Sequence, residues 1–246
     1  MPDDQGIEIV VNDHNRPFQF DDSDLRLVSA DDVVFNIHTW KLKAASSVFQ
    51  AMFEAGNGNS TVKLTDETLE NGRILSMFLK ILYGIHLEDP SDRSDLMMNH
   101  EILLQFVVKY DASAAKEHLT TCFRLWASNA KLGSDRYFLL GSQLNQYEIA
   151  TASLKRAIAV QSTWTGPPDG MGSRQALLLH GIKNERTLNI ASWPFYDFRK
   201  LSHEYMFGFM RAREIVMEPN KSKVDYKLVA AEFEKIMKDL TLEDAN

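Results

Sequence analysis

The sequence predicts an α+β fold, in which a small sheet with surrounding helices is followed by an all-α C-terminal region. Residues 24–37 alternate apolar with polar side chains or are rich in β-branched and aromatic residues, as strands are. Residues 40–53 carry apolar side chains at helical spacing, and beyond Trp126 this spacing largely replaces strand patterns. With 246 residues, 44% of them hydrophobic, the chain can bury a substantial core.

The sheet begins with two predicted strands joined by a tight turn. Leu25 and Leu27 alternate with polar neighbours, and residues 33–37 are mainly β-branched or aromatic. Residues 30–32, Ala-Asp-Asp, supply the turn. The period then changes, so we predict one continuous helix over residues 40–53. Its apolar stripe consists of Leu42, Ala45, Phe49 and Met52.

The middle of the chain is predicted to add a third strand and three helices. Residues 61–64 follow a Gly- and Asn-rich loop and form the strand. Thr65 or Asp66 is the predicted N-cap of the next helix. A polar insert follows, and two further helices are then expected. The insert spans residues 86–98, and the two helices span residues 99–110 and 112–126.

The C-terminal half is predicted to be helical. Residues 135–159 carry apolar side chains at helical spacing. Residues 164–172 contain three Gly and two Pro, which cannot continue a helix. A short helix is expected over residues 173–180.

Two more helices complete the predicted fold. One begins at Pro194, a residue suited to a first helical turn, and the last is capped by Ser222 with Asp225 three residues on. The helix after Pro194 has an unusually wide apolar face, so it is either central or covered by a partner. The residues that widen this face are Met206, Phe207 and Met210.

Several motifs in the first half resemble the BTB/POZ domain, in its fungal type. They are Asp24-x-x-Leu27, Phe35-x-x-His38, Leu42-x-x-x-Ser46-Ser47-x-Phe49-x-x-Met52-Phe53, Val62–Asp66, Tyr83-Gly84 and Ile102–Asp111. The resemblance implies a BTB/POZ-like small sheet with surrounding helices over residues 24–127. An acidic N-terminal segment, residues 1–23, would precede it, and a helical C-terminal region, residues 128–246, would follow.

The resemblance also implies a protein–protein interaction module that binds protein partners and self-associates as a homodimer, acting as a scaffold or adaptor. The candidate dimer or partner interface consists of Leu42, Ala45, Phe49, Met52 and Phe53. Residues 7–11 are predicted to form a short strand, either exchanged across a dimer or paired within its own chain.

Two other functions stay open. The first is a substrate adaptor of a cullin-type ubiquitin ligase. Cullin binders of this family often carry a hydrophobic-x-Glu element between the first long helix and the next strand, and residues 54–61 lack it. The second is a helical small-molecule binder or enzyme that uses the C-terminal half, although no convergent polar cluster is visible there.

Charge and cysteine content restrict the partners and the compartment. Residues 1–35 hold nine acidic and two basic residues, a net charge of −7 that equals the charge of the whole chain. Such a balance does not suit nucleic acid, and no apolar run approaches the ~20 residues of a membrane span. A single cysteine, Cys122, predicted to be buried, and a start without a secretory signal favour an intracellular location, in cytoplasm or nucleus.

The sequence shows no motif for catalysis, a cofactor or a metal. The seven histidines follow no zinc-site spacing, and no G-x-S-x-G motif occurs. We therefore predict a protein that is not an enzyme and has no catalytic, cofactor-binding or metal-binding residue. His38 is expected to pack or to form a hydrogen bond. The aromatic residues of segment 195–200 are interpreted as core or interface rather than as an RNA-stacking surface.

Overall fold

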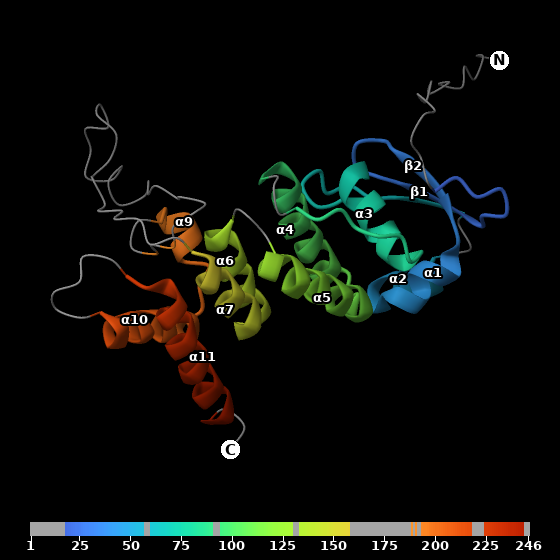
Figure 1. Cartoon of the computed structure of the whole chain (residues 1–246). Helices are drawn as coiled ribbons and strands as arrows, with labels where there is room; N and C mark the ends of the chain where they lie inside the picture. Colours follow the sequence, from blue (N-terminus) through green and yellow to red (C-terminus); the bar gives the residue numbers. More distant parts are fainter. Residues whose placement is uncertain are drawn as a thin grey trace, which may run out of the picture. The chain divides into compact units, whose positions relative to one another are not determined.

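The structure is a computed structural model that describes residues 18–56, 60–90, 94–129, 133–157, 188, 190, 193–217 and 224–243. The chain divides into two compact units (Figure 1). Unit 1 comprises residues 1–87 and 105–115, and unit 2 comprises residues 88–104 and 116–246. The predicted strand at 7–11, the break at 164–172 and the helix at 173–180 lie outside the described residues.

Unit 1 contains a three-stranded sheet in the order β2-β1-β3. The strands are β1 (Leu25–Val28), β2 (Val34–Ile37) and β3 (Thr61–Lys63). β1 pairs antiparallel with β2 and parallel with β3. Leu25 lies opposite Ile37 and Leu27 opposite Phe35, and all four side chains are buried. The period-2 pattern therefore predicted both the strand pair and the face that it buries.

Two helices follow the sheet where the sequence predicted one. They are α1 (Thr39–Ala45) and α2 (Ser47–Ala55). Ser46 separates them because its backbone is extended, with φ −147° and ψ 123°. Its hydroxyl accepts a hydrogen bond from the Phe49 N–H and donates one to the carbonyl oxygen of Tyr110. The prediction of one continuous helix over residues 40–53 was wrong at this residue.

The next helix of unit 1, α3 (Gly72–Leu82), begins later than predicted. Its N-cap is Asn71, whose side chain accepts a hydrogen bond from the Ile74 N–H. Asp66 instead caps the turn before the helix, accepting from the N–H groups of Thr68 and Leu69. Figure 1 shows α1, α2 and α3 gathered on one side of the sheet.

Two long helices each contribute residues to both units. They are α4 (Ser94–Lys109) and α5 (Ser113–Asn129). Phe106 and Tyr110, at the end of α4, complete the core of unit 1, where Phe106 lies 5.0 Å from Phe78 between ring centroids. In unit 2, α5 buries Leu119, Phe123 and Trp126. Both helices were predicted, α4 with a later start.

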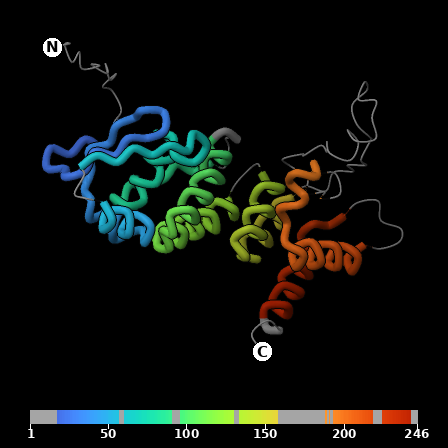
Figure 2. The backbone as a smooth tube through the Cα atoms, turned by 180° about the vertical axis from the view of Figure 1, so that it is seen from behind, coloured from blue at the N-terminus to red at the C-terminus, as the bar shows by residue number. Residues whose placement is uncertain are grey.

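The remaining elements of unit 2 are helices. They are α6 (Ser134–Leu144), α7 (Tyr147–Arg156), α9 (Phe195–Phe198), α10 (His203–Val216) and α11 (Tyr226–Glu243). The segment 135–159 is divided between α6 and α7, because Asn145 adopts a left-handed conformation with φ 52°. Figure 2 shows α7 packed between α6 and α11, and α10 packs against α11.

Two helix starts in unit 2 differ from the predicted ones. Pro194 precedes only the short α9, and α10 has its own N-cap, Ser202, whose hydroxyl accepts from the Tyr205 N–H. At α11, the carboxylate of Asp225 accepts from the N–H groups of Lys227 and Leu228. The cap of α11 is therefore Asp225, whereas Ser222 lies outside the described residues.

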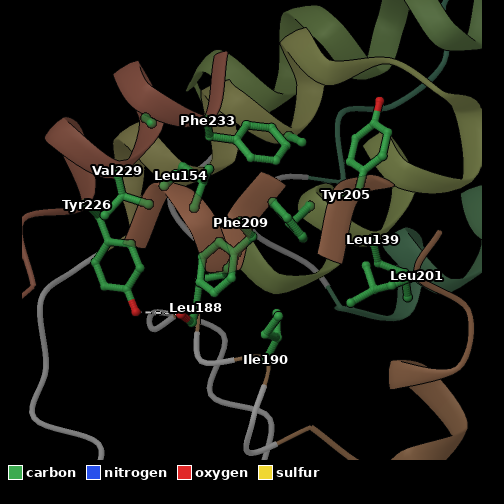
Figure 3. Packing of buried hydrophobic residues seen from close by; sticks show 14 of the residues in the cluster. Leu139, Leu154, Leu188, Ile190, Leu201, Tyr205, Phe209, Tyr226, Val229 and Phe233 are labelled. Carbon is green, nitrogen blue, oxygen red and sulfur yellow. Dashed lines mark hydrogen bonds between the residues drawn. The ribbon is translucent and has the colours of Figure 1, made fainter. Parts of the chain in front are cut away.

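The core of unit 2 is an aromatic and aliphatic cluster from α6, α7, α10 and α11 (Figure 3). The ring of Phe138 lies 5.5 Å from that of Phe209 and 5.6 Å from that of Phe233. The Tyr226 hydroxyl donates to the carbonyl oxygen of Leu188, as the dashed line in Figure 3 marks. None of the helices within the described residues is long and apolar enough to cross a membrane.

Candidate protein-interaction surface

The predicted interface residues divide between the core of unit 1 and its surface. Leu42 and Phe49 are fully buried, and the Phe49 ring stacks on Tyr110 with 4.4 Å between centroids. Their side chains are needed by the core, so a partner cannot contact them while unit 1 is folded. Ala45, Met52 and Phe53 are only partly buried, and contact of these three with a partner stays a prediction.

Helix α2 also carries a row of apolar side chains that are exposed or, for Met52, partly exposed. These residues, named here the α2 stripe, are Val48, Ala51, Met52 and Ala55. Their spacing of i, i+3, i+4 and i+7 places them on one face of the helix. The polar face lies elsewhere, where the Gln50 side chain donates to Glu54 over 2.9 Å. The α2 stripe therefore contains no charge and no hydrogen-bonding side chain.

A hollow of about 410 Å³ lies where the end of α2 approaches the sheet. Its lining includes Met52, Phe53, Lys43 and residues of β3, the outer strand on this side of the sheet. The opposite edge, β2, is covered by residues 18–20, since Asn36 exchanges backbone hydrogen bonds with Phe18 and Phe20. The outer edge of β3 pairs with no strand among the described residues.

Trp40 on α1 is a large aromatic side chain that is 59% exposed. The Lys41 ammonium lies 4.7 Å from the centroid of the Trp40 ring and donates to the carbonyl oxygen of Leu82 over 3.1 Å. A cation above an indole face adds an attraction that orients both side chains. Trp40 is thus held at the surface in a defined position.

His38 forms hydrogen bonds, as predicted. Its Nδ1 lies 2.9 Å from the Tyr83 hydroxyl and its Nε2 lies 3.2 Å from Asp22. The same hydroxyl accepts the backbone N–H of His38 over 3.1 Å. Burial and the nearby Asp24 and Asp22 raise the pKa of Tyr83, so its hydroxyl stays protonated. These hydrogen bonds connect the start of α1 to the end of α3, so the role of His38 is structural.

The carboxylate of Glu70, which is buried in unit 1, also takes part in structural hydrogen bonds. It accepts from the N–H groups of Thr65 and Asp66, from the Tyr110 hydroxyl and from Lys109. Burial alone would raise the pKa of Glu70, but these four donors outweigh it and hold the pKa below its usual value. No set of three or more metal-ligating side chains occurs among the described residues.

Unit 1 is a small sheet flanked by helices. His38 and Glu70 are used in structural contacts, and the α2 stripe at the surface is uncharged. These features fit a module that binds proteins. Residues 15–124 match the BTB/POZ domain family. This domain is a protein–protein interaction module. The comparison with curated proteins finds no match. We refer to residues 15–124 as the BTB/POZ region.

The match agrees with the predicted fold, an α+β BTB/POZ region followed by a helical region. The fungal type stays a prediction, as do the domain boundaries at residues 24 and 127. Phe18 is fully buried, with its ring 5.6 Å from Tyr83, so residues of the predicted acidic segment contribute to the core of unit 1. The aromatic residues Phe18 and Phe20 were the sequence signal for this.

Proposed function

We propose that the BTB/POZ region mediates self-association of this chain and that the chain acts as a scaffold or adaptor for other proteins. The observation that carries the proposal is the α2 stripe. A solvent-facing side of a helix normally carries charged or polar residues, whereas this side of α2 is apolar. Apolar surface of this kind marks interaction sites.

A dimer interface would have to extend beyond the α2 stripe. A stable dimer buries roughly 800 Å² on each partner, more than one helix stripe can offer. Trp40 adds an exposed aromatic side chain, and the outer edge of β3, which pairs with no strand among the described residues, adds backbone groups. A second copy covering α1, α2 and β3 would bury all three features.

The test is the mass of the chain in solution, measured by analytical ultracentrifugation between about 1 and 200 µM. We expect twice the mass of one chain at the upper end. Val48→Asp should shift the equilibrium to monomer, because Val48 is 38% exposed and lies on the α2 stripe. The matched control is Val108→Asp, since Val108 is 58% exposed on α4. A monomeric wild-type chain, or equal effects of both variants, would refute the proposal.

Scaffold and adaptor differ in what else the chain binds, and affinity capture with wild-type and Val48→Asp chains separates them. A scaffold that acts through self-association loses its partners in the Val48→Asp chain, whereas an adaptor with a separate target site retains them. The cullin-adaptor function stays a prediction that no contact among the described residues favours. We further expect no catalytic activity.

A further inference from the structure

Unit 2 contains an open hollow of about 660 Å³ beside α9 and α10. Most of its lining is aromatic or contains methionine, and two charged residues of α10 complete it. The lining residues are Ile190, Trp193, Phe195, Phe198, Phe209, Met210, Arg213, Glu214 and Met217. This volume lies within the range of ligand pockets, and methionine-rich surfaces adapt to apolar partners.

The hollow continues into an exposed apolar row along α10. Phe207, Met210 and Met217 are all exposed, and Met210 and Met217 also line the hollow. With Glu214 they follow the spacing i, i+3, i+7 and i+10, a row of about 15 Å along the helix axis. The opposite side of α10 is already buried against α11. Helix α10 is therefore apolar on two sides, and the part of the chain that the structure describes packs against only one of them.

Two arginines of α10, Arg211 and Arg213, outnumber the one carboxylate at this surface, Glu214, so the net charge here favours an acidic partner. The Nε of Arg213 is buried and has no hydrogen-bond partner within the described part of the chain. Arg211 lies 5.4 Å from the centroid of the Phe207 ring and, among the described residues, has no carboxylate within ion-pair distance. A buried donor without an acceptor is unfavourable. An occupant that brings a carboxylate would satisfy Arg213 and neutralise Arg211.

We propose that the hollow and the exposed row form a groove that docks an acidic amphipathic helix of a partner protein. The length of the row fits about three turns of helix, whereas a small molecule would fill the hollow and leave Phe207 exposed. Apolar side chains of the partner enter the hollow, and its acidic residues meet Arg211 and Arg213. The groove lies outside the BTB/POZ region, so the inference does not rest on the proposed self-association.

The probe is a fluorescein-labelled, designed 16-residue peptide with Leu and Trp at i, i+3, i+4 and i+7 and Glu at most other positions. Its binding to the full chain is followed by fluorescence anisotropy. We expect saturable binding with a Kd of about 1–100 µM. A peptide of the same composition in scrambled order, and one with Lys in place of Glu, should bind at least about tenfold more weakly. No saturable binding of the designed peptide up to about 500 µM overturns the proposal.

Two variants on one helix locate the binding. Met210 and Ile215 are exposed to nearly the same degree, at 60% and 58%, but only Met210 lines the hollow. Met210→Asp should weaken peptide binding by about tenfold or more, and Ile215→Asp by less than about twofold. Equal losses would mean non-specific attraction to exposed apolar residues and would overturn the proposal. Circular dichroism melting confirms that both chains stay folded.

A third variant tests the charge, and the mass of the chain tests the identity of the occupant. Arg213→Met keeps the apolar volume and should reduce the preference for the Glu peptide over a Gln analogue. An unchanged preference contradicts the role of Arg213. If Met210→Asp makes a self-associated chain monomeric, the groove belongs to a second copy and the proposal fails. Val48→Asp should leave peptide binding unchanged, which separates this test from that of the proposed function.

Discussion

The hydroxyl of Tyr110 donates a 2.7 Å hydrogen bond to Oε1 of Glu70, a residue only 3% exposed. Oε2 of the same carboxylate accepts the N–H groups of Thr65 and Asp66, each over 2.8 Å. Lys109 lies 2.7 Å from Oε1. One carboxylate thus joins three parts of unit 1: the segment that follows β3, the turn before α3 and the end of α4.

Removing this carboxylate should destabilise unit 1 strongly. In Glu70→Ala, the buried Tyr110 hydroxyl and the partly buried N–H groups of Thr65 and Asp66 lose their acceptor, and Lys109 loses one of its two carboxylates. We expect a loss of about 3 kcal/mol or more in the free energy of unfolding. Urea unfolding followed by tryptophan fluorescence measures it. Glu54→Ala, at an exposed position on α2, is the control, and a similar loss in both would show that Glu70 does not hold these elements together.

The same contacts predict a dependence of stability on acid. Hydrogen bonding to Lys109 lowers the pKa of Asp66, and for Glu70 the donors outweigh burial, so both pKa values lie below the usual 3.8 and 4.5. A lowered carboxyl pKa stabilises the fold above the unfolded-state value, and this stability is lost as the pH falls through the folded-state value. Stability should therefore fall steeply below about pH 4.5. Urea midpoints at a series of pH values measure the slope.

Lys109→Met is the variant that tests this explanation. Without the ammonium, the pKa values of Asp66 and Glu70 should rise, and the dependence on pH below about 4.5 should become shallower. Lys116→Met, an exposed lysine on α5, should keep the wild-type slope. A slope in Lys109→Met as steep as in the wild type would contradict the assignment.

The breaks between α1 and α2 and between α6 and α7 were not predicted from the sequence. Local alternation predicted β1 and β2, and helical spacing predicted that the C-terminal half is helical. Ser46 is the N-cap of α2, a position that serine favours, so the break had a local signal, whereas its second hydrogen bond, to the carbonyl oxygen of Tyr110 64 positions away, had none. Asn145 ends α6 in a left-handed conformation that asparagine tolerates and does not require.

The candidate sites were predictable only in part, because the exposure of a residue depends on contacts with segments elsewhere in the chain. Periodicity placed Phe49 and Met52 on one stripe, but it could not show that the core covers one and leaves the other partly exposed. Cys122 was predicted to be buried and is half-buried, and burial raises the pKa of its thiol. The wide apolar face of α10 was visible in the sequence, whereas the hollow is also lined by Ile190 and Trp193, which lie before α9 and outside the helical pattern of α10.

His100 predicts a second dependence of stability on pH, between about pH 6.5 and 5. Its Nδ1 donates to the carbonyl oxygen of Leu96 over 2.7 Å, and its ring meets Trp126 edge-on at 5.0 Å. Burial lowers its pKa below 6.5, although Leu96, Asp89 and Glu88 act in the opposite direction. The unfolded chain therefore takes up a proton at a pH where the folded chain does not, and stability should fall as the pH drops from about 6.5 to 5.

The measurement is again the free energy of unfolding as a function of pH, for two histidine variants. His100→Phe should abolish the slope between about pH 6.5 and 5, because no buried imidazole then resists protonation. His118→Phe changes an exposed histidine on α5 and should leave the slope intact. A slope that persists in His100→Phe and disappears in His118→Phe would contradict the argument.

Gly141 and Gly208, two glycines in helices of unit 2, differ in how far the atoms next to them can move if a side chain is added. A Cβ at Gly141 of α6 would lie 2.8 Å from the backbone nitrogen of Ala150 in α7. A Cβ at Gly208 of α10 would lie 2.8 Å from the sulfur of Met237 in α11 and 3.2 Å from the ring of Phe233. The first neighbour is backbone and cannot move without shifting a helix, whereas a methionine side chain can adopt another rotamer.

Gly141→Ala should therefore cost more stability than Gly208→Ala. Both substitutions gain the same helix propensity, about 1 kcal/mol, so the difference between them reports the contacts alone. We expect Gly141→Ala to lower the free energy of unfolding by about 1–3 kcal/mol and Gly208→Ala to lower it by less than about 1 kcal/mol. Thermal and urea unfolding of the two variants give the comparison. If Gly208→Ala proved the more harmful, α10 and α11 would be packed more rigidly than α6 and α7, and the flexibility of Met237 could not be the deciding factor.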